Sequence, residues 1–197
     1  MKDYALYYSY KGIGDVLVIV FDNALPTTRS ERIGNVVALY NEDKLIGCNI
    51  FDIKEIIKIK SSGFIYYPSE QFLSVINSML KNAKLPTLEL KENSGYFIGE
   101  VKEISNGIIT LNDGVAYLKE HTLKVGDKVV FAKVGTYLNN GQVVKEENKD
   151  GVVINSHICT NKELGINDEE TILVLDEDEQ VGLDFFSLEE NLWMKWN

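Results

Sequence analysis

The sequence predicts an α+β domain over residues 1–92, followed by an all-β barrel over residues 93–197. Three observations lead to this division. The first half combines apolar runs with one clear amphipathic helix, whereas the second half consists of short apolar runs that glycines separate or flank. Between the two halves lies a polar, turn-prone stretch at residues 91–95, and we place the domain boundary there.

The first domain opens with two pairs of predicted strands. Residues 4–10 and 16–22 are apolar runs on either side of a turn that contains Gly12 and Gly14, which indicates two adjacent strands. Residues 36–40 and 45–51 flank a polar turn in the same way. The two glycines of the first turn do not indicate a phosphate-binding loop, because the third glycine and the following helix of that fingerprint are missing.

One helix is predicted in the first domain. Its apolar residues recur at spacings of three and four, and Ser69 is a suitable N-cap residue. Pro86 follows Leu85 and ends the pattern. The apolar residues of this helix are Phe72, Leu73, Ile76, Met79, Leu80 and Ala83.

The second domain contains six candidate strands, at residues 96–104, 107–111, 128–134, 142–145, 151–154 and 171–175. Short strands with glycine-rich turns, in about a hundred residues, indicate a five-stranded barrel of the OB-fold type. Residues 160–164 are expected to form one helical turn that Gly165 stops. A further short helix is expected at the end of the sequence, with Leu188, Leu192, Trp193 and Trp196 on one face.

The net charge of −10 lies entirely in the second domain. Residues 1–92 carry 11 basic and 11 acidic side chains, whereas residues 93–197 carry 9 basic and 19 acidic ones. An acidic surface repels phosphate, so a nucleic-acid site would require a local basic patch.

The composition indicates a soluble cytoplasmic protein. No signal peptide is recognisable, and the longest apolar run, residues 16–21, is far too short to span a membrane. The two cysteines, Cys48 and Cys159, lie far apart in the sequence and are expected to be reduced thiols.

Neither a catalytic site nor a metal site is predicted. His157 and Cys159 would point to the same side of an extended strand, but zinc requires three or four ligands and only His121 and Cys48 remain to complete the set. A Cys–His nucleophile would also need an orienting third group and an oxyanion site. The acidic run at residues 176–179 lacks the spacing of a calcium loop. We therefore expect no cofactor.

A basic and aromatic stretch is the remaining candidate for a binding surface. Lys128 and Lys133 bracket an apolar strand, and Tyr137 follows it. OB-type barrels bind single-stranded nucleic acid through faces that mix cations and aromatic rings. Alternation along a strand places the two lysines on opposite faces, however, so an ordinary solvated strand explains the pattern as well as an RNA site does.

The stretch VGDKVVFAKVGTYLNNG at residues 125–141, followed by NSHICTNKELGI at residues 155–166, resembles the tRNA-binding domain family. The first half is similar to the domain that precedes it in two-domain bacterial tRNA-binding proteins of the YtpR type, through GIGDVL at residues 12–17, GNVV at 34–37 and GCNIF at 47–51. The sequence departs from the family where Asn155-Ser156-His157 replaces Ser-Gly-Met, where Thr160 replaces the serine after Cys159, and where residues 101–124 are shorter than the corresponding region.

The resemblance implies an OB fold that binds tRNA or another structured RNA and has no catalytic activity of its own. Lysines would contact phosphates, while hydroxyl and amide groups would hydrogen-bond the backbone or a base. The rival hypothesis is a protein–protein interaction or dimerisation module, such as a homodimer, whose degenerate OB fold has lost RNA binding. The shortened region at residues 101–124, the acid excess and the tryptophans of the tail favour it. The residues expected to contact RNA are Lys128, Lys133, Tyr137, Asn155, Ser156, Thr160 and Lys162.

Overall fold

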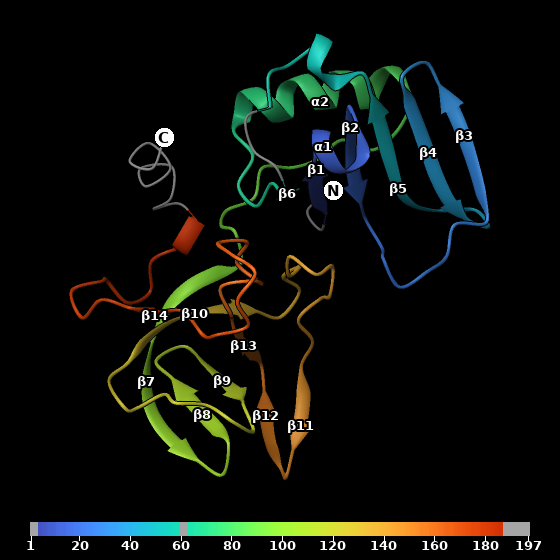
Figure 1. Cartoon of the computed structure of the whole chain (residues 1–197). Helices are drawn as coiled ribbons and strands as arrows, with labels where there is room; N and C mark the ends of the chain where they lie inside the picture. Colours follow the sequence, from blue (N-terminus) through green and yellow to red (C-terminus); the bar gives the residue numbers. More distant parts are fainter. Residues whose placement is uncertain (1–3, 60–62, 187–197) are drawn as a thin grey trace. The chain divides into compact units, whose positions relative to one another are not determined.

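The computed structural model describes residues 4–59 and 63–186. The described chain is rich in β-structure and contains few helices (Figure 1). It divides into two compact units, Met1–Glu92 and Asn93–Asn197. The helix expected around Trp193 and Trp196 lies outside the described residues.

The first unit is built on an antiparallel sheet with the strand order β3-β4-β5-β2-β1-β6. The two predicted strand pairs are confirmed, as β1 with β2 and as β4 with β5. Two strands were not predicted, because β3 is mostly polar and β6 has only two residues. The elements preceding the long helix are β1 (Ala5–Tyr8), α1 (Tyr10–Ile13), β2 (Val16–Val20), β3 (Arg29–Ile33), β4 (Val36–Asn41), β5 (Lys44–Phe51), the 3₁₀ turn η1 (Ile53–Glu55) and β6 (Gly63–Phe64).

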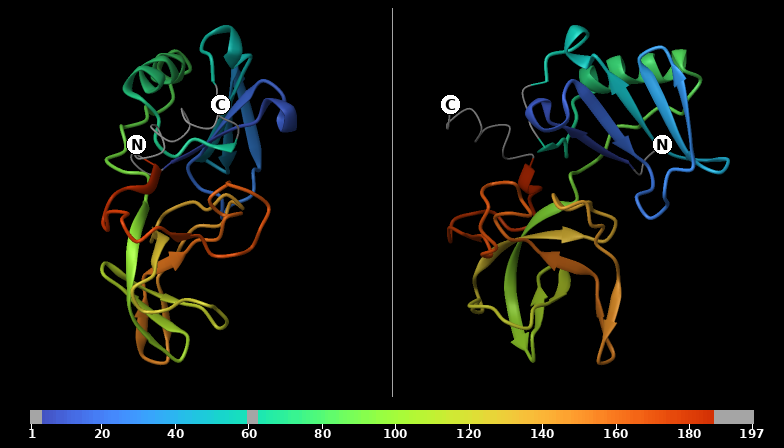
Figure 2. Two further views of the ribbon diagram at one scale, coloured as in Figure 1. Left: turned by 60° about the vertical axis from the view of Figure 1, so that its left-hand side comes forward. Right: turned by 45° about the vertical axis from the view of Figure 1, so that its right-hand side comes forward.

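The predicted helix is confirmed as α2 (Glu70–Asn82). The Ser69 hydroxyl accepts a hydrogen bond from the backbone N–H of Phe72 at 3.2 Å, which satisfies one of the free amides of the first turn. Leu73, Ile76 and Leu80 are buried in the core of this unit. The helix covers one face of the sheet (Figure 2).

The second unit contains a five-stranded path with the order β13-β10-β7-β8-β9. The paired ladders do not close into a ring, but the backbone N–H of Asn155 donates to the carbonyl of Val115 at 3.0 Å and so connects the β9 end of the path to the start of β13. The strands are β7 (Tyr96–Ser105), β8 (Ile108–Leu111), β9 (Gly114–Tyr117), β10 (Lys128–Lys133), β13 (Ser156–Ile158), β14 (Val174–Leu175), which pairs with β10, and the hairpin of β11 (Glu147–Lys149) with β12 (Val152–Ile154).

Two hairpins of this unit turn at a residue pair in which both φ angles are positive. These are Asn106-Gly107, with φ of 51° and 80°, and Asp150-Gly151, with φ of 51° and 85°. Asn-Gly and Asp-Gly are the preferred pairs for such turns because they tolerate the left-handed region. The second pair is therefore the signal in the sequence for β11, which was not predicted.

The strand predicted over residues 142–145 is wrong. Only Val143 makes an isolated bridge there, to Tyr137. The backbone N–H of Leu138 donates to the carbonyl of Gln142, and Gly141 adopts a φ of 84°, so the chain turns back within a tight loop. The two consecutive valines of this stretch, Val143 and Val144, belong to the loop, where Val144 is buried.

Candidate nucleic-acid interface

The two lysines of the predicted basic stretch make contacts within the unit. The Nζ atom of Lys128 donates to the backbone carbonyls of Glu177 and Glu179. These bonds fix the acidic turn against the start of β10, so Lys128 has a structural role.

Lys133, at the other end of β10, is more accessible. Its Nζ lies 2.7 Å from Oδ2 of Asp113 and 4.5 Å from the ring centroid of Phe97. The Lys133 and Asp113 side chains are 42% and 64% exposed, so solvent screens the pair and it adds little to stability. A phosphate could therefore replace Asp113 as the partner of this lysine.

Lys133 also lines a shallow recess of about 340 Å³. Asp113, Val134, Glu146 and Asn155 complete its lining. Two of these five side chains are acids, which disfavours an anion in the recess itself.

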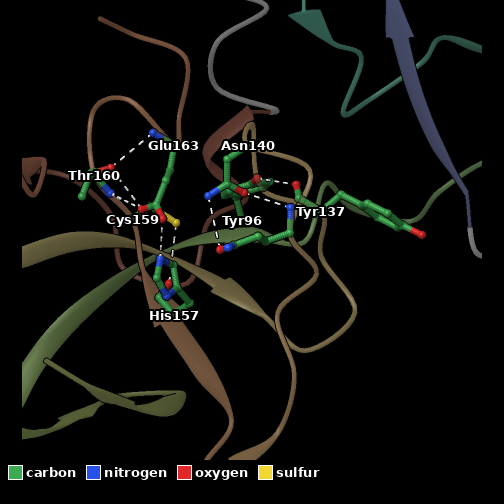
Figure 3. Close-up of polar contacts among 8 residues, drawn as sticks. Tyr96, Tyr137, Asn140, His157, Cys159, Thr160 and Glu163 are labelled. Carbon is green, nitrogen blue, oxygen red and sulfur yellow. Dashed lines mark hydrogen bonds and ion pairs between the residues drawn. The ribbon is translucent and has the colours of Figure 1, made fainter. Parts of the chain in front are cut away.

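Tyr137 is half-buried in the loop that follows β10. Its carbonyl accepts a hydrogen bond from the hydroxyl of Tyr96 at 2.6 Å (Figure 3). The backbone of Tyr137 is therefore anchored to the first strand of the unit, β7.

Asn155 and Ser156 lie where β12 passes into β13. The Asn155 side-chain carbonyl accepts from the backbone N–H of Val115 at 2.8 Å, so this exposed amide also joins β9 to β13. Ser156 is only 4% exposed, and among the described residues its Oγ has no hydrogen-bond partner. Gly114 lies directly opposite, since a Cβ atom there would be 2.7 Å from that oxygen.

Thr160 and Glu163 form a reciprocal capping arrangement around the predicted turn. The Glu163 carboxylate accepts from the backbone N–H of Thr160 at 2.9 Å, and the Thr160 hydroxyl accepts from the backbone N–H of Glu163 at 3.2 Å. The turn closes with a bond from the Leu164 N–H to the Thr160 carbonyl at 3.0 Å, and Gly165 follows with a φ of 75°. The spacing Thr-x-x-Glu is the sequence signal for such a box, and it would have identified Glu163, which was not predicted as a site residue.

Glu163 has a second partner in His157 (Figure 3). Nε2 of His157 donates to Oε1 of Glu163 at 3.0 Å. Burial raises the pKa of Glu163, but the hydrogen bonds from His157 and Thr160 outweigh it and hold the pKa below the ordinary value. His157 is thus paired with a carboxylate and not with Cys159.

Cys159 is an inert thiol. It is fully buried, and its Sγ contacts the carbonyl of His157 at 3.6 Å. Burial, with a further contribution from the Glu163 charge, raises the pKa of this thiol well above its ordinary value. A protonated, inaccessible sulfur is a poor nucleophile and a poor metal ligand. No cluster of three or more metal-ligating side chains occurs within residues 4–59 and 63–186.

Two loops meet next to this turn. The side-chain amide of Asn139 donates to the carbonyl of Lys162 at 3.3 Å, and Asn140 accepts from the backbone N–H of Gln142 at 2.9 Å. Lys162 is exposed and pairs with Glu170 at 2.7 Å. The two loops therefore bring the side-chain amides of Asn139 and Asn140 close to Lys162. Asn139 and Asn140 were not among the residues predicted to contact RNA.

The outer face of β8 and β9 carries an aromatic side chain, Tyr117, which a lysine of β11 contacts; neither residue was singled out from the sequence. Ile109 and Leu111 of β8 and Ala116 of β9 are buried in the core of this unit, so Thr110 and Tyr117 face outward. Nζ of Lys149, on β11, lies 3.9 Å from the ring centroid of Tyr117.

A protein of Bacillus subtilis is 30% identical to this chain over 194 residues, and the match covers 89% of this chain and 96% of that protein. It carries the name "Putative tRNA-binding protein YtpR".

The chain belongs to the YtpR family.

Two further matches each cover a part of this YtpR-family chain. Residues 24–90 match a domain of unknown function, DUF4479. The phenylalanine–tRNA ligase beta subunit of Dehalococcoides mccartyi is 46% identical over 66 residues, which make up 30% of this chain and 8% of that subunit. Within the described ranges, no helix of this YtpR-family member is long and apolar enough to cross a membrane.

Proposed function

We propose that this YtpR-family chain binds tRNA, or another structured RNA, and that its second unit is an OB-type barrel which makes the contacts without catalysing a reaction. The observation that carries the proposal is the 46% identity with part of a tRNA ligase subunit. The relative that matches almost the whole chain is also named for tRNA binding.

Strand order supports the OB-type barrel. In that fold the first three strands form a meander, the first also pairs with the fourth, and the fifth lies between the third and the fourth. The path β13-β10-β7-β8-β9 has this order when its ends are joined, and the Asn155–Val115 bonds lie where β9 would meet β13. Strands two and three of the barrel are then β8 and β9.

OB folds bind nucleic acid on the face of strands two and three and on the loops around it. That face holds Tyr117, an aromatic ring on which a base can stack, and Lys149 of β11 lies over the ring and supplies a cation for phosphate. Among the residues predicted from the sequence, Lys133, Asn155 and Lys162 are accessible and lie on β10 or the nearby loops. Lys128 is bonded to the carbonyls of the acidic turn and Ser156 is buried, so we assign both residues a structural role and no direct contact with RNA.

The acid excess sets the conditions for binding. With a net charge of −10 on residues 93–197, long-range repulsion opposes RNA, so a few local cations must supply the attraction. Such binding weakens steeply as salt rises. Neither cysteine forms a disulfide, and reduced thiols, like tRNA, are typical of the cytoplasm. We therefore propose that the chain acts in the cytoplasm.

Filter binding of labelled tRNA by the full chain tests the proposal. We expect retention at about 50 mM salt and a loss of roughly an order of magnitude or more at about 200 mM. The matched variants are Lys149→Glu, on the proposed face, and Lys81→Glu, an exposed lysine of α2 that changes the net charge equally. No retention at low salt, or equal losses in both variants, would contradict the proposed interface.

A further inference from the structure

Four residue pairs of the second unit have the composition that can form a succinimide ring. In this reaction the backbone nitrogen of one residue attacks the side-chain carbonyl carbon of the asparagine or aspartate that precedes it. Glycine in the second position favours the attack, because it has no side chain to obstruct its nitrogen and its backbone adopts more conformations. The pairs are Asn106-Gly107, Asp113-Gly114, Asn140-Gly141 and Asp150-Gly151.

The two aspartate pairs are poorly arranged for this reaction. An ionised carboxylate is a poor target for a nitrogen nucleophile, whereas an amide side chain carries no charge. The Asp113 carboxylate also lies 2.7 Å from Nζ of Lys133. At the other pair, the backbone N–H of Gly151 donates to Oδ1 of Asn148 at 3.1 Å, so the nitrogen that would attack is already bonded.

The Asn140-Gly141 pair is restrained at both reacting groups. The backbone N–H of Gly141 donates to the carbonyl of Leu138 at 2.8 Å. The Asn140 side chain accepts from the backbone N–H of Gln142 at 2.9 Å and donates to Oε1 of the same residue at 3.3 Å. These bonds must break before the ring can close.

The Asn106-Gly107 pair has neither restraint. It forms the turn between β7 and β8, with positive φ at both residues. The backbone N–H of Gly107 donates to no described residue, and the exposed side chain of Asn106 makes no hydrogen bond within residues 4–59 and 63–186. The carbonyl of Gly107 accepts from the backbone N–H of Leu118 at 2.8 Å. That bond involves the following peptide group, so it leaves the attacking nitrogen free.

This turn lies against the aromatic ring of the proposed RNA-binding face. A Cβ atom on Gly107 would be 3.0 Å from Cε2 of Tyr117, so the glycine backbone packs against that ring. Nζ of Lys149 lies 3.9 Å from the centroid of the same ring. A carboxylate formed at position 106 therefore adds negative charge beside this lysine and opposes the approach of phosphate.

We propose that Asn106 is a site of spontaneous deamidation and that its conversion weakens RNA binding by the neighbouring face. The Gly107 nitrogen gives up its proton to base and bonds to Cγ of Asn106, while Nδ2 takes up a proton and leaves as ammonia. Water then opens the succinimide ring. Cleavage of the bond from Cγ to the Gly107 nitrogen gives aspartate, and cleavage of the bond from the backbone carbonyl carbon of residue 106 to that nitrogen gives isoaspartate.

Peptide mapping by mass spectrometry tests the deamidation, which does not depend on the proposed function. The full chain is incubated in mildly alkaline buffer and digested at intervals. We expect Asn106 to be converted about tenfold faster than Asn140, because hydrogen bonds must break first at Asn140. In urea the two asparagines should react at similar rates, since both then precede glycine in an unfolded chain. An unmodified Asn106, or an Asn140 that reacts as fast in the folded chain, would overturn the proposal.

Fluorescence anisotropy with labelled tRNA at low salt tests the effect on binding, which rests on the proposed function. Asn106→Asp introduces the charge of the product and should weaken binding severalfold. The control is Asn82→Asp, at the exposed end of α2, which changes the net charge equally and should leave the affinity unchanged. Equal affinities of Asn106→Asp and the wild type would overturn the effect on RNA. A wild type without affinity for tRNA would contradict the proposed function together with this effect, and the peptide map alone would then decide the deamidation.

Discussion

His157 and Glu163 are joined by a hydrogen bond of 3.0 Å between Nε2 and Oε1, which ties strand β13 to the turn that follows it. The same carboxylate caps the turn at Thr160. The Glu163 side chain therefore joins strand and turn within residues 155–166, one of the two stretches that carry the family resemblance.

Replacing Glu163 by alanine should lower the free energy of unfolding by about 1–2 kcal/mol, because the cap and the bond to His157 are both lost. Urea denaturation measures the change. Glu120→Ala removes an exposed carboxylate of the same unit and should change the value by less than about 0.5 kcal/mol. Equal effects of the two substitutions would show that the capping arrangement contributes no stability.

The contribution of Glu163 should depend on pH in the acid range. Burial raises its pKa, yet the bonds from His157 and Thr160 prevail and hold the pKa below its ordinary value. A carboxyl group with a lowered pKa stabilises the fold fully above its unfolded pKa and loses this effect as the pH falls through the folded pKa. Thermal melts of the wild type and Glu163→Gln should therefore differ at pH 6 and converge toward about pH 3. A difference that stays constant over this range would contradict the assignment.

Both thiols should be unreactive in the folded chain. Burial raises the pKa of Cys48 to about 12 and that of Cys159 well above its ordinary value, and neither sulfur is accessible. A thiol reagent at about pH 8 should modify neither cysteine before denaturant is added and both afterwards. Val125→Cys, at a position that is 65% exposed, provides the control that reacts at once. Rapid modification of the native wild type would mean that one cysteine is exposed.

Gly95→Ala should be more destabilising than Gly126→Ala. Both glycines have positive φ, 89° and 97°, so each alanine has similar backbone strain. A Cβ at position 95 would lie 2.2 Å from Oγ1 of Thr136, whereas nothing lies within 4 Å of one at position 126. We expect a difference of about 1–3 kcal/mol in the free energy of unfolding. The double variant Gly95→Ala/Thr136→Ala should recover part of the lost free energy of unfolding. If it recovers none, the clash between Cβ of residue 95 and Oγ1 of Thr136 is not the cause of the loss.

Tyr117→Ala should weaken RNA binding, whereas Tyr117→Phe should retain it, because a base stacks on the ring and not on the hydroxyl. The expected loss for alanine is about 1–3 kcal/mol. Fluorescence anisotropy with a labelled tRNA at low salt measures both variants. Equal affinities for alanine and phenylalanine would exclude Tyr117 as a stacking platform.

Regular local patterns predicted much of the secondary structure. The spacing of Leu73, Ile76 and Leu80 with the cap at Ser69 predicted α2, and apolar runs on either side of turns predicted β1, β2, β4 and β5. Short or polar strands such as β3 and β13 were missed, because pairing with neighbours and not their own composition determines them.

The sequence by itself determined the residue types of the candidate site, the concentration of negative charge in residues 93–197 and the likeness to tRNA-binding domains. Only the tertiary structure decided which of these side chains face solvent. Lys128 is bonded to the carbonyls of Glu177 and Glu179, about fifty positions away in the sequence, and Lys149 lies over Tyr117 because a hairpin brings it there. Such contacts join residues that are distant in sequence, and no local spacing records them.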